Sequence, residues 1–134
     1  MYKLIVSLLL VPVFMANAND KDTLTIDRFV SNNLEFSFPN DKGYKPKSSD
    51  FDLINYVVMS NEYGERWAVL TLTNLSSGNR VLERDHIMAT FADGEVKSPL
   101  NLKLDFEGKE TQSITVSFGK SKFPILSIKA ETEK

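Results

Sequence analysis

The amino-acid sequence predicts an all-β protein, and more specifically a single antiparallel immunoglobulin-like β-sandwich of about seven to eight strands. Apolar and polar residues alternate along many short runs, and clusters of Gly, Pro, Asn, Asp and Ser separate those runs. No segment of the mature chain carries apolar residues at the 3.6-residue spacing of an amphipathic helix. A small β-barrel would produce the same pattern, so it is the alternative fold.

Composition limits the classes of protein that this chain can belong to. Its 134 residues suit one domain, and 42% hydrophobic with 25% charged residues is typical of a globular protein. The chain has no Cys and one His, which excludes disulfides, thiolate metal sites and multi-His metal sites. Sixteen basic residues against 18 acidic ones leave no basic surface for nucleic acid. We expect no resident cofactor and no nucleic-acid partner, whereas the oligomeric state stays open.

The N-terminus has the three parts of a secretory signal peptide. Lys3 supplies the positive charge, residues 4–15 form an apolar run, and Ala16-Asn17-Ala18 matches the small-x-small cleavage pattern. The run is shorter than the roughly 20 residues that a membrane-spanning helix needs. We therefore expect cleavage after Ala18, a soluble domain over residues 19–134, and a periplasmic or secreted location in a bacterium. A retained anchor or a buried N-terminal helix is the alternative.

Four strands are predicted in the first half of the mature chain, over residues 24–30, 34–38, 51–59 and 66–73. The polar segment 40–49 is the longest predicted loop, and Asn61-Glu62-Tyr63-Gly64 is a turn sequence. In the fourth strand Ala68, Leu70 and Leu72 share one face. The triplet Asn74-Leu75-Ser76 matches the N-glycosylation pattern, but we interpret it as part of a turn.

The second half continues the alternation. Residues 87–91 form a strand that ends before Asp93-Gly94, a dipeptide that favours a tight hairpin. The spacing of apolar residues over 100–106 predicts the next strand, and Gly108 turns the chain into another over 114–118. A last strand is predicted over 125–130, followed by a frayed charged tail, residues 131–134.

Three of these turns carry a family resemblance. A strand ends in Thr73-Asn74-Leu75-Ser76, the next ends in Ala92-Asp93-Gly94, and Gly108 leads into Val116-Ser117-Phe118. This order resembles small immunoglobulin-like domains that bacteria export, a group of uncharacterised function. The resemblance covers about residues 67–118 and implies the fold without a particular activity, because one sandwich hosts many unrelated sites.

Aromatic residues beside turns are the candidate binding residues. Tyr44 lies in the polar loop, and Tyr63 and Trp67 flank a turn that also contains Arg66. Tyr, Trp and Arg are enriched in binding hot spots, and aromatic rings stack on sugars. The sequence therefore predicts a non-enzymatic module that binds a protein or glycan partner. The alternative is that Trp67 covers the core, and an edge strand could recruit a partner without any motif.

Two other functions stay open at this point. His86, Met88 and Met59 offer an imidazole and two thioethers, ligands that suit Cu(I) in a periplasmic copper-binding protein. The alternative places Met59 in the core and His86-x-Met88 on a half-exposed strand surface. A small hydrolase would need Ser and Asp residues to converge on His86, but Gly-x-Ser-x-Gly is absent. We expect a solvent-facing His86 and no enzymatic activity.

Overall fold

The computed structural model describes residues 21–27 and 45–133. The predicted signal peptide, the predicted strand over 34–38 and the candidate residue Tyr44 lie outside the described residues. Over the described ranges the protein is all-β, built mainly from antiparallel sheets, and its one helical turn is the 3₁₀ segment η1 (Arg84–His86). No helix in this part of the chain is long and apolar enough to span a membrane.

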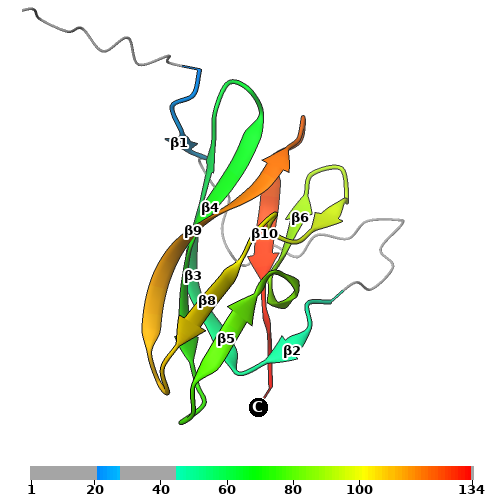
Figure 1. Cartoon of the computed structure of the whole chain (residues 1–134). Coiled ribbons are helices and arrows are strands. Elements are labelled where there is room, and N and C mark those ends of the chain that lie inside the picture. Colours follow the sequence, from blue (N-terminus) through cyan, green and yellow to red (C-terminus); the bar gives the residue numbers. More distant parts are fainter. Residues whose placement is uncertain (1–20, 28–44, 134) are drawn as a thin grey trace, which may run out of the picture.

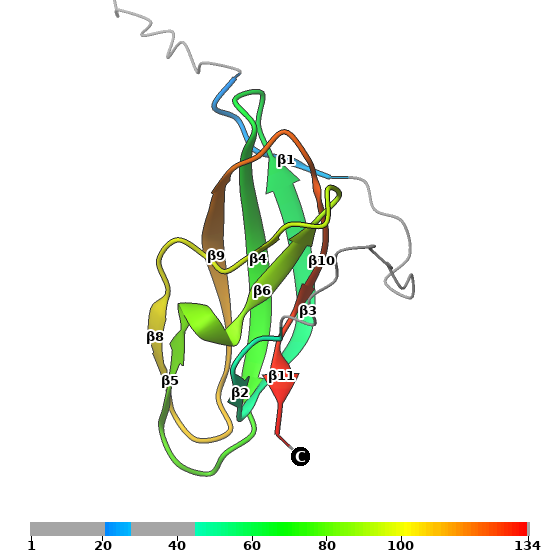
Figure 2. The same cartoon turned by 90° about the vertical axis from the view of Figure 1, so that its right-hand side faces the viewer.

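The strands follow one another along the chain as Figures 1 and 2 show. Their bounds are β1 (Thr25–Ile26), β2 (Ser48–Ser49), β3 (Phe51–Ser60), β4 (Glu65–Asn74), β5 (Arg80–Glu83), β6 (Met88–Phe91), β7 (Val96–Lys97), β8 (Lys103–Phe106), β9 (Thr111–Lys120), β10 (Ile125–Lys129) and β11 (Glu131–Thr132).

The largest sheet has the strand order β1-β3-β4-β9, and all of its pairings are antiparallel. Side chains alternate between its two faces, since successive residues of a strand point in opposite directions. Ala68, Leu70 and Leu72 of β4 are fully buried, so the predicted inner face of this strand is confirmed. Trp67 pairs with Met59 of β3, and both side chains lie on the opposite, outer face.

The remaining strands form smaller sheets. Three strands pair in the order β10-β6-β7, β5 pairs with β8, and the short β2 and β11 form the one parallel pairing among the described residues. The hairpin predicted at Asp93-Gly94 is confirmed between β6 and β7. The Gly94 N–H donates to the Phe91 carbonyl at 2.9 Å, and Gly94 adopts a φ of 86° that favours glycine.

The hydrophobic core draws side chains from the largest sheet and from the smaller sheets alike. Its aromatic members include a T-shaped contact between Phe51 and Phe106, whose ring centroids are 5.0 Å apart. The buried apolar residues are Phe51, Val58, Ala68, Leu70, Leu72, Leu82, Ile87, Ala89, Phe91, Phe106, Val116, Phe118, Ile125 and Ile128.

Two predicted boundaries were wrong. The strand predicted over 100–106 begins only at Lys103, because the Leu100 N–H donates to the Ser117 carbonyl at 2.8 Å and leaves the Leu100 side chain 53% exposed. The tail predicted to fray instead contains β11. Thr132 there donates from Oγ1 to the Phe51 carbonyl at 2.8 Å, which holds the segment against the start of β3.

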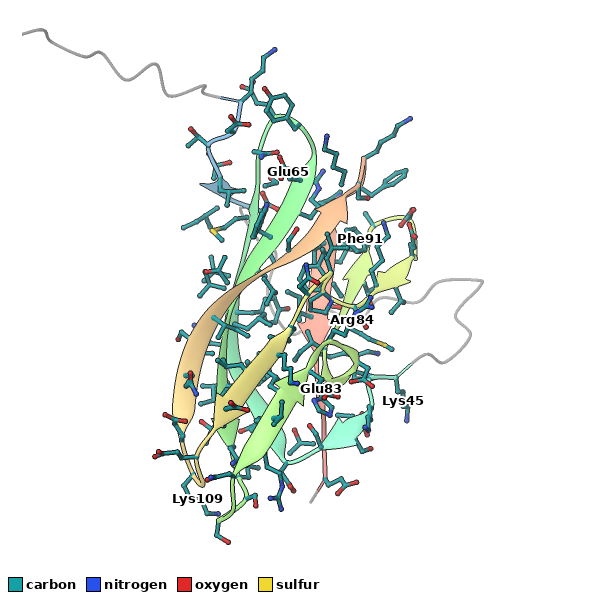
Figure 3. All side chains as sticks on the ribbon, viewed as in Figure 1. Lys45, Glu65, Glu83, Arg84, Phe91 and Lys109 are labelled. Carbon is teal, nitrogen blue, oxygen red and sulfur yellow. The ribbon has the colours of Figure 1, made fainter. Side chains whose placement is uncertain are left out.

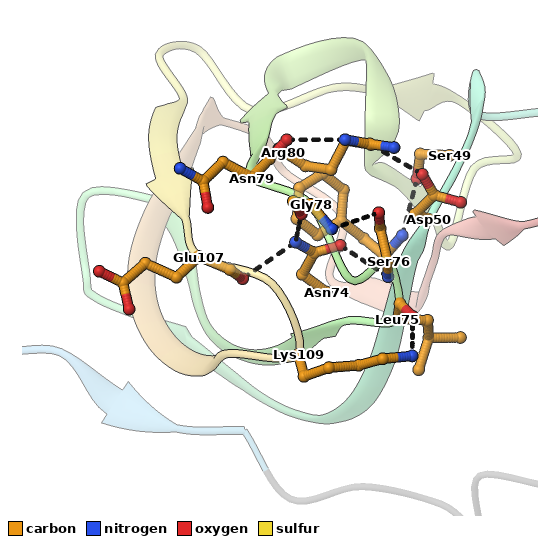
Figure 4. A network of polar contacts seen from close by, with 11 residues as sticks. Ser49, Asp50, Asn74, Leu75, Ser76, Gly78, Asn79, Arg80, Glu107 and Lys109 are labelled. Atoms are coloured by element: carbon orange, nitrogen blue, oxygen red, sulfur yellow. Dashed lines mark hydrogen bonds and ion pairs between the residues drawn. The ribbon is translucent and has the colours of Figure 1, made fainter.

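At one end of the molecule a polar network joins two turns that are distant in sequence (Figure 4). The Asn74 side chain is fully buried and donates from Nδ2 to the carbonyls of Gly78 at 2.9 Å and Glu107 at 3.0 Å. Its Oδ1 accepts a hydrogen bond from the Ser76 N–H at 3.0 Å. The interpretation of 74–76 as part of a turn is confirmed, and the side-chain amide serves as the link between the two turns.

Candidate functional site

The turn between β3 and β4 presents an aromatic ring at the opposite end of the molecule. Asn61 Oδ1 accepts hydrogen bonds from the backbone N–H groups of Tyr63, at 3.1 Å, and Glu65, at 3.0 Å. Asn commonly organises turns through such side-chain to backbone bonds. The predicted turn over 61–64 is confirmed, and Tyr63 lies within it with its side chain 42% exposed.

The turn between β9 and β10 lies directly beside it. The Ser121 N–H donates to the Gly64 carbonyl at 2.9 Å, and Arg66 donates to the Ser121 carbonyl from both Nε and Nη2 at 3.2 Å. The Phe123 N–H donates to Ser121 Oγ at 3.1 Å, and the Phe123 ring is 45% exposed. Phe123 is therefore held next to the turn that carries Tyr63.

Lys120 lies over the Tyr63 ring, and Leu100 flanks the end of β9 that leads to Lys120. Lys120 Nζ lies 5.9 Å from the centroid of the Tyr63 ring, within the range of a cation–π contact. Leu100 lies beside the end of β9, where a Cβ on Gly119 would be 3.7 Å from its side chain. We call Tyr63, Leu100, Lys120 and Phe123 the aromatic end.

The two ends of the molecule can be followed in Figure 3. The label Glu65 lies near the aromatic end, and the label Lys109 lies near the Asn74 network.

The structure separates the candidate binding residues. Tyr63 belongs to the aromatic end, but the Arg66 guanidinium is mostly buried and holds the Ser121 turn, with Nη1 4.0 Å from Asp27 Oδ2. Trp67 lies on the outer face of the largest sheet, paired with Met59 and Ser117. The expectation that Tyr63, Arg66 and Trp67 form one exposed group was therefore wrong, because the alternation of β4 directs successive side chains to different surfaces.

His86 is not the solvent-facing strand residue that the sequence predicted. It ends η1, its side chain is 8% exposed, and its Nδ1 accepts a hydrogen bond from the Glu83 N–H at 2.9 Å. The Glu83 side chain accepts in return from the His86 backbone N–H, so the two residues form a reciprocal capping box. This local pairing turns the chain out of strand geometry between β5 and β6, and it gives the imidazole a structural partner.

The three proposed copper ligands do not meet. His86 lies against Phe51, at the start of β3, whereas Met59 lies eight residues further along the same strand, roughly 25 Å away at the rise of an extended chain. Met59 is also on the outer face of the sheet, while Phe51 is in the core. Met88 is half-buried on β6, where it pairs with Lys129. Residues 21–27 and 45–133 also contain no cluster of three His, Asp or Glu residues that could hold a metal.

Sequence reasoning missed three of the four members of the aromatic end, namely Leu100, Lys120 and Phe123. Phe123 stands between Lys122 and Pro124, and Leu100 directly follows Pro99. A large apolar residue next to proline was the available signal, since Pro breaks the strand ladder and places its neighbours in turns. Leu100 did not stand out because the apolar pattern assigned it to the start of a predicted strand.

Comparison of the chain with protein-family models, with curated proteins and with solved structures finds no match.

Proposed function

We propose that this chain is an exported, non-enzymatic binding module that recognises a protein or glycan partner in the bacterial envelope or outside the cell. The observation that carries the proposal is the aromatic end. The exposed rings of Tyr63 and Phe123 lie on two neighbouring turns, and Lys120 lies over the Tyr63 ring. The exposed Leu100 side chain lies beside Gly119, the residue before Lys120 at the end of β9. Exposed apolar groups gathered with a polar rim mark interaction sites.

The scaffold that we propose is an immunoglobulin-like β-sandwich of about seven to eight strands. Seven strands of four or more residues support that number, and a core shared by the largest sheet and the smaller sheets supports packing of sheets face to face. A closed barrel would require continuous strand pairing around the molecule. The consecutive strands β8 and β9 do not pair with each other in the described residues, because β8 pairs with β5 and β9 pairs with β4. This break between the two sheets favours the sandwich over the barrel. A rigid scaffold of this kind suits binding by its end loops.

The chemistry of the aromatic end suits recognition better than catalysis. An exposed Tyr or Phe ring can stack on a sugar ring or enter an apolar pocket of a protein, and both have low side-chain entropy to lose on binding. Lys120 adds a positive charge for a carboxylate on either kind of partner. Against the hydrolase alternative, the one imidazole of the chain is buried and accepts a backbone hydrogen bond.

Export is proposed from the sequence of residues 1–18. Its test is mass spectrometry of the protein from the envelope and from the culture medium of its own host. A mature N-terminus at Asn19 is expected in one of these fractions. An intact Met1 there would overturn the proposal of a cleaved signal peptide.

The binding proposal is tested by chemical cross-linking of the tagged mature protein in its host, followed by identification of what is captured. A double variant, Tyr63→Ala with Phe123→Ala, should lose at least about tenfold in capture, because truncating two hot-spot aromatics costs more than about 1 kcal/mol each. The matched control is Leu75→Ala with Val81→Ala. These side chains are similarly exposed, at 41% and 38%, but lie toward the other end of the molecule. The control should bind as the unmodified protein does.

The outcomes separate the candidate surfaces. Capture lost only in the Tyr63 and Phe123 variant, with an unchanged melting temperature, supports the aromatic end. Equal capture by both double variants overturns it. A third variant, Trp67→Ala, probes the outer face of the largest sheet. Loss of the partner in that variant alone would move the binding site from the aromatic end to the sheet face.

A further inference from the structure

Strand β9 is an edge of the largest sheet, and half of its outer side is open. The Asn74 N–H donates to the carbonyl of Glu110, the residue just before β9, at 2.8 Å. Because backbone hydrogen bonds alternate along a strand, the even-numbered residues of β9 therefore bond to β4. Odd-numbered residues point their backbone groups away from β4. Ser117 is one of them, and its carbonyl accepts the Leu100 N–H. Over Thr111–Thr115 no backbone group of the described residues takes the corresponding place.

This open stretch lacks the features that normally protect an edge strand. Natural edges carry lysines, prolines or bulges that prevent pairing with another chain. Residues 111–119 contain no charged residue and no proline, and the register of β9 with β4 is regular from Thr111 to Ser117. Thr111, Ser113 and Thr115 expose their side chains on the outer face. The edge is therefore suited to a neutral, hydroxyl-bearing strand.

We propose that two copies of this chain associate through their β9 edges, antiparallel and about a two-fold axis at Ser113. In that register Ser113 faces Ser113 of the second copy, and Thr111 faces Thr115. Equivalent pairs already occur inside one chain: Thr71 and Ser113 hydroxyls are 2.8 Å apart, and those of Thr73 and Thr111 are 2.6 Å apart. A two-fold contact uses the same surface on both copies, so β9 is its own complement.

The length and charge of the strand agree with this arrangement. The five residues from Thr111 to Thr115 all find partners, and pairing stops where Leu100 already covers Ser117. Glu110 precedes β9 and Lys120 ends it. In the antiparallel register Glu110 lies opposite Val116 of the second copy, about 13 Å along the strand from the second copy's Lys120, whereas a parallel arrangement places the two Glu110 carboxylates next to each other. This inference does not depend on the aromatic end.

Single cysteines test the register, since the chain has none of its own. Residues opposite each other in a hydrogen-bonded antiparallel pair have Cα atoms about 5.5 Å apart, a separation that a disulfide spans. Ser113→Cys should therefore form a covalent dimer under mild oxidation. Thr115→Cys should not, because the two copies of residue 115 would be about 13 Å apart along the strands. Ser77→Cys, an exposed turn position, controls for random collision.

Sedimentation velocity of the uncrosslinked protein from micromolar to millimolar concentration gives the second readout. The unmodified protein should shift from monomer to dimer, and Thr115→Lys should stay monomeric with an unchanged melting temperature. Ser77→Lys should dimerise as the unmodified protein does. A monomer at every concentration, or equal cross-linking at positions 77, 113 and 115, would overturn the proposal. So would capture of a different polypeptide by Ser113→Cys in the host envelope.

Discussion

Phe51 and His86 lie against each other in the interior, with ring centroids 5.7 Å apart and ring planes inclined by 45°. Phe51 begins β3, and His86 ends the 3₁₀ turn between β5 and β6. The same Phe51 ring also contacts Phe106 of β8. Through these contacts the one histidine of the chain becomes part of the core.

The first prediction concerns this histidine. His86→Leu should lower the free energy of unfolding by about 1 kcal/mol, because it removes the acceptor of the part-buried hydrogen bond from the Glu83 N–H. His86→Asn should cost less if its side-chain oxygen takes the place of Nδ1. Urea denaturation measures both. Equal stability of His86→Leu and the unmodified protein would show that the capping box contributes nothing.

The Asn74 network gives the second prediction. Asn74→Ala removes three hydrogen bonds from a fully buried side chain, and we expect a loss of about 2–3 kcal/mol. The matched control is Asn79→Ala, which truncates an exposed side chain nearby and should change stability by less than about 0.5 kcal/mol. Thermal denaturation followed by circular dichroism compares the two. Similar melting temperatures would contradict the linking role of Asn74.

The third prediction compares two glycines near the Asn74 network, Gly108 and Gly78, which differ in the space around an added Cβ atom. A Cβ at Gly108 would lie 2.1 Å from the Ser77 carbonyl oxygen, so Gly108→Ala must displace one turn and should cost at least about 2 kcal/mol. At Gly78 the nearest atom is Arg80 Nη1 at 3.1 Å, the end of a flexible side chain. Gly78→Ala should therefore be nearly neutral. The reverse order of stabilities in denaturant titrations would refute the close approach of the two turns.

The fourth prediction concerns the C-terminal strand. Thr132→Val removes the hydroxyl that donates to the Phe51 carbonyl and should destabilise the protein by about 1 kcal/mol. Thr115→Val, at an exposed strand position, should have little effect, since valine favours strands. Hydrogen exchange of the residues around β2 and β11 would report the change locally. Unchanged exchange there in Thr132→Val would mean that the tail is frayed after all.

A fifth prediction addresses copper. Because the structure places Met59 far from His86 and on the outer face of the largest sheet, titration with Cu(I) under anaerobic conditions should reveal no site that needs both methionines. Met59→Leu and Met88→Leu should leave any Cu(I) binding unchanged. Loss of a stoichiometric copper site in each variant separately would instead restore the copper-binding alternative.

Local pattern was sufficient for a large part of the fold. The alternation over β4 predicted that Ala68, Leu70 and Leu72 face the core, because the side-chain period of a strand is two. The Asp93-Gly94 hairpin and the turn before Gly64 were predictable because they depend on the preferences of adjacent residues. Of the aromatic end, only Tyr63 was predicted. Lys120 and the two apolar residues join it through the position of other turns.

The sequence by itself determined the strand alternation and several turns, since these depend on neighbours within a few residues. Only the tertiary structure decided the burial of His86, the linking role of Asn74 and the pairing of β11. The residues that decided these features are distant along the chain: the Phe51 ring packs on His86, Glu107 lies 33 residues from Asn74, and Phe51 lies 81 residues from Thr132. A buried polar group must find its hydrogen-bond partner wherever the fold provides one, and one-dimensional periodicity carries no information about that position.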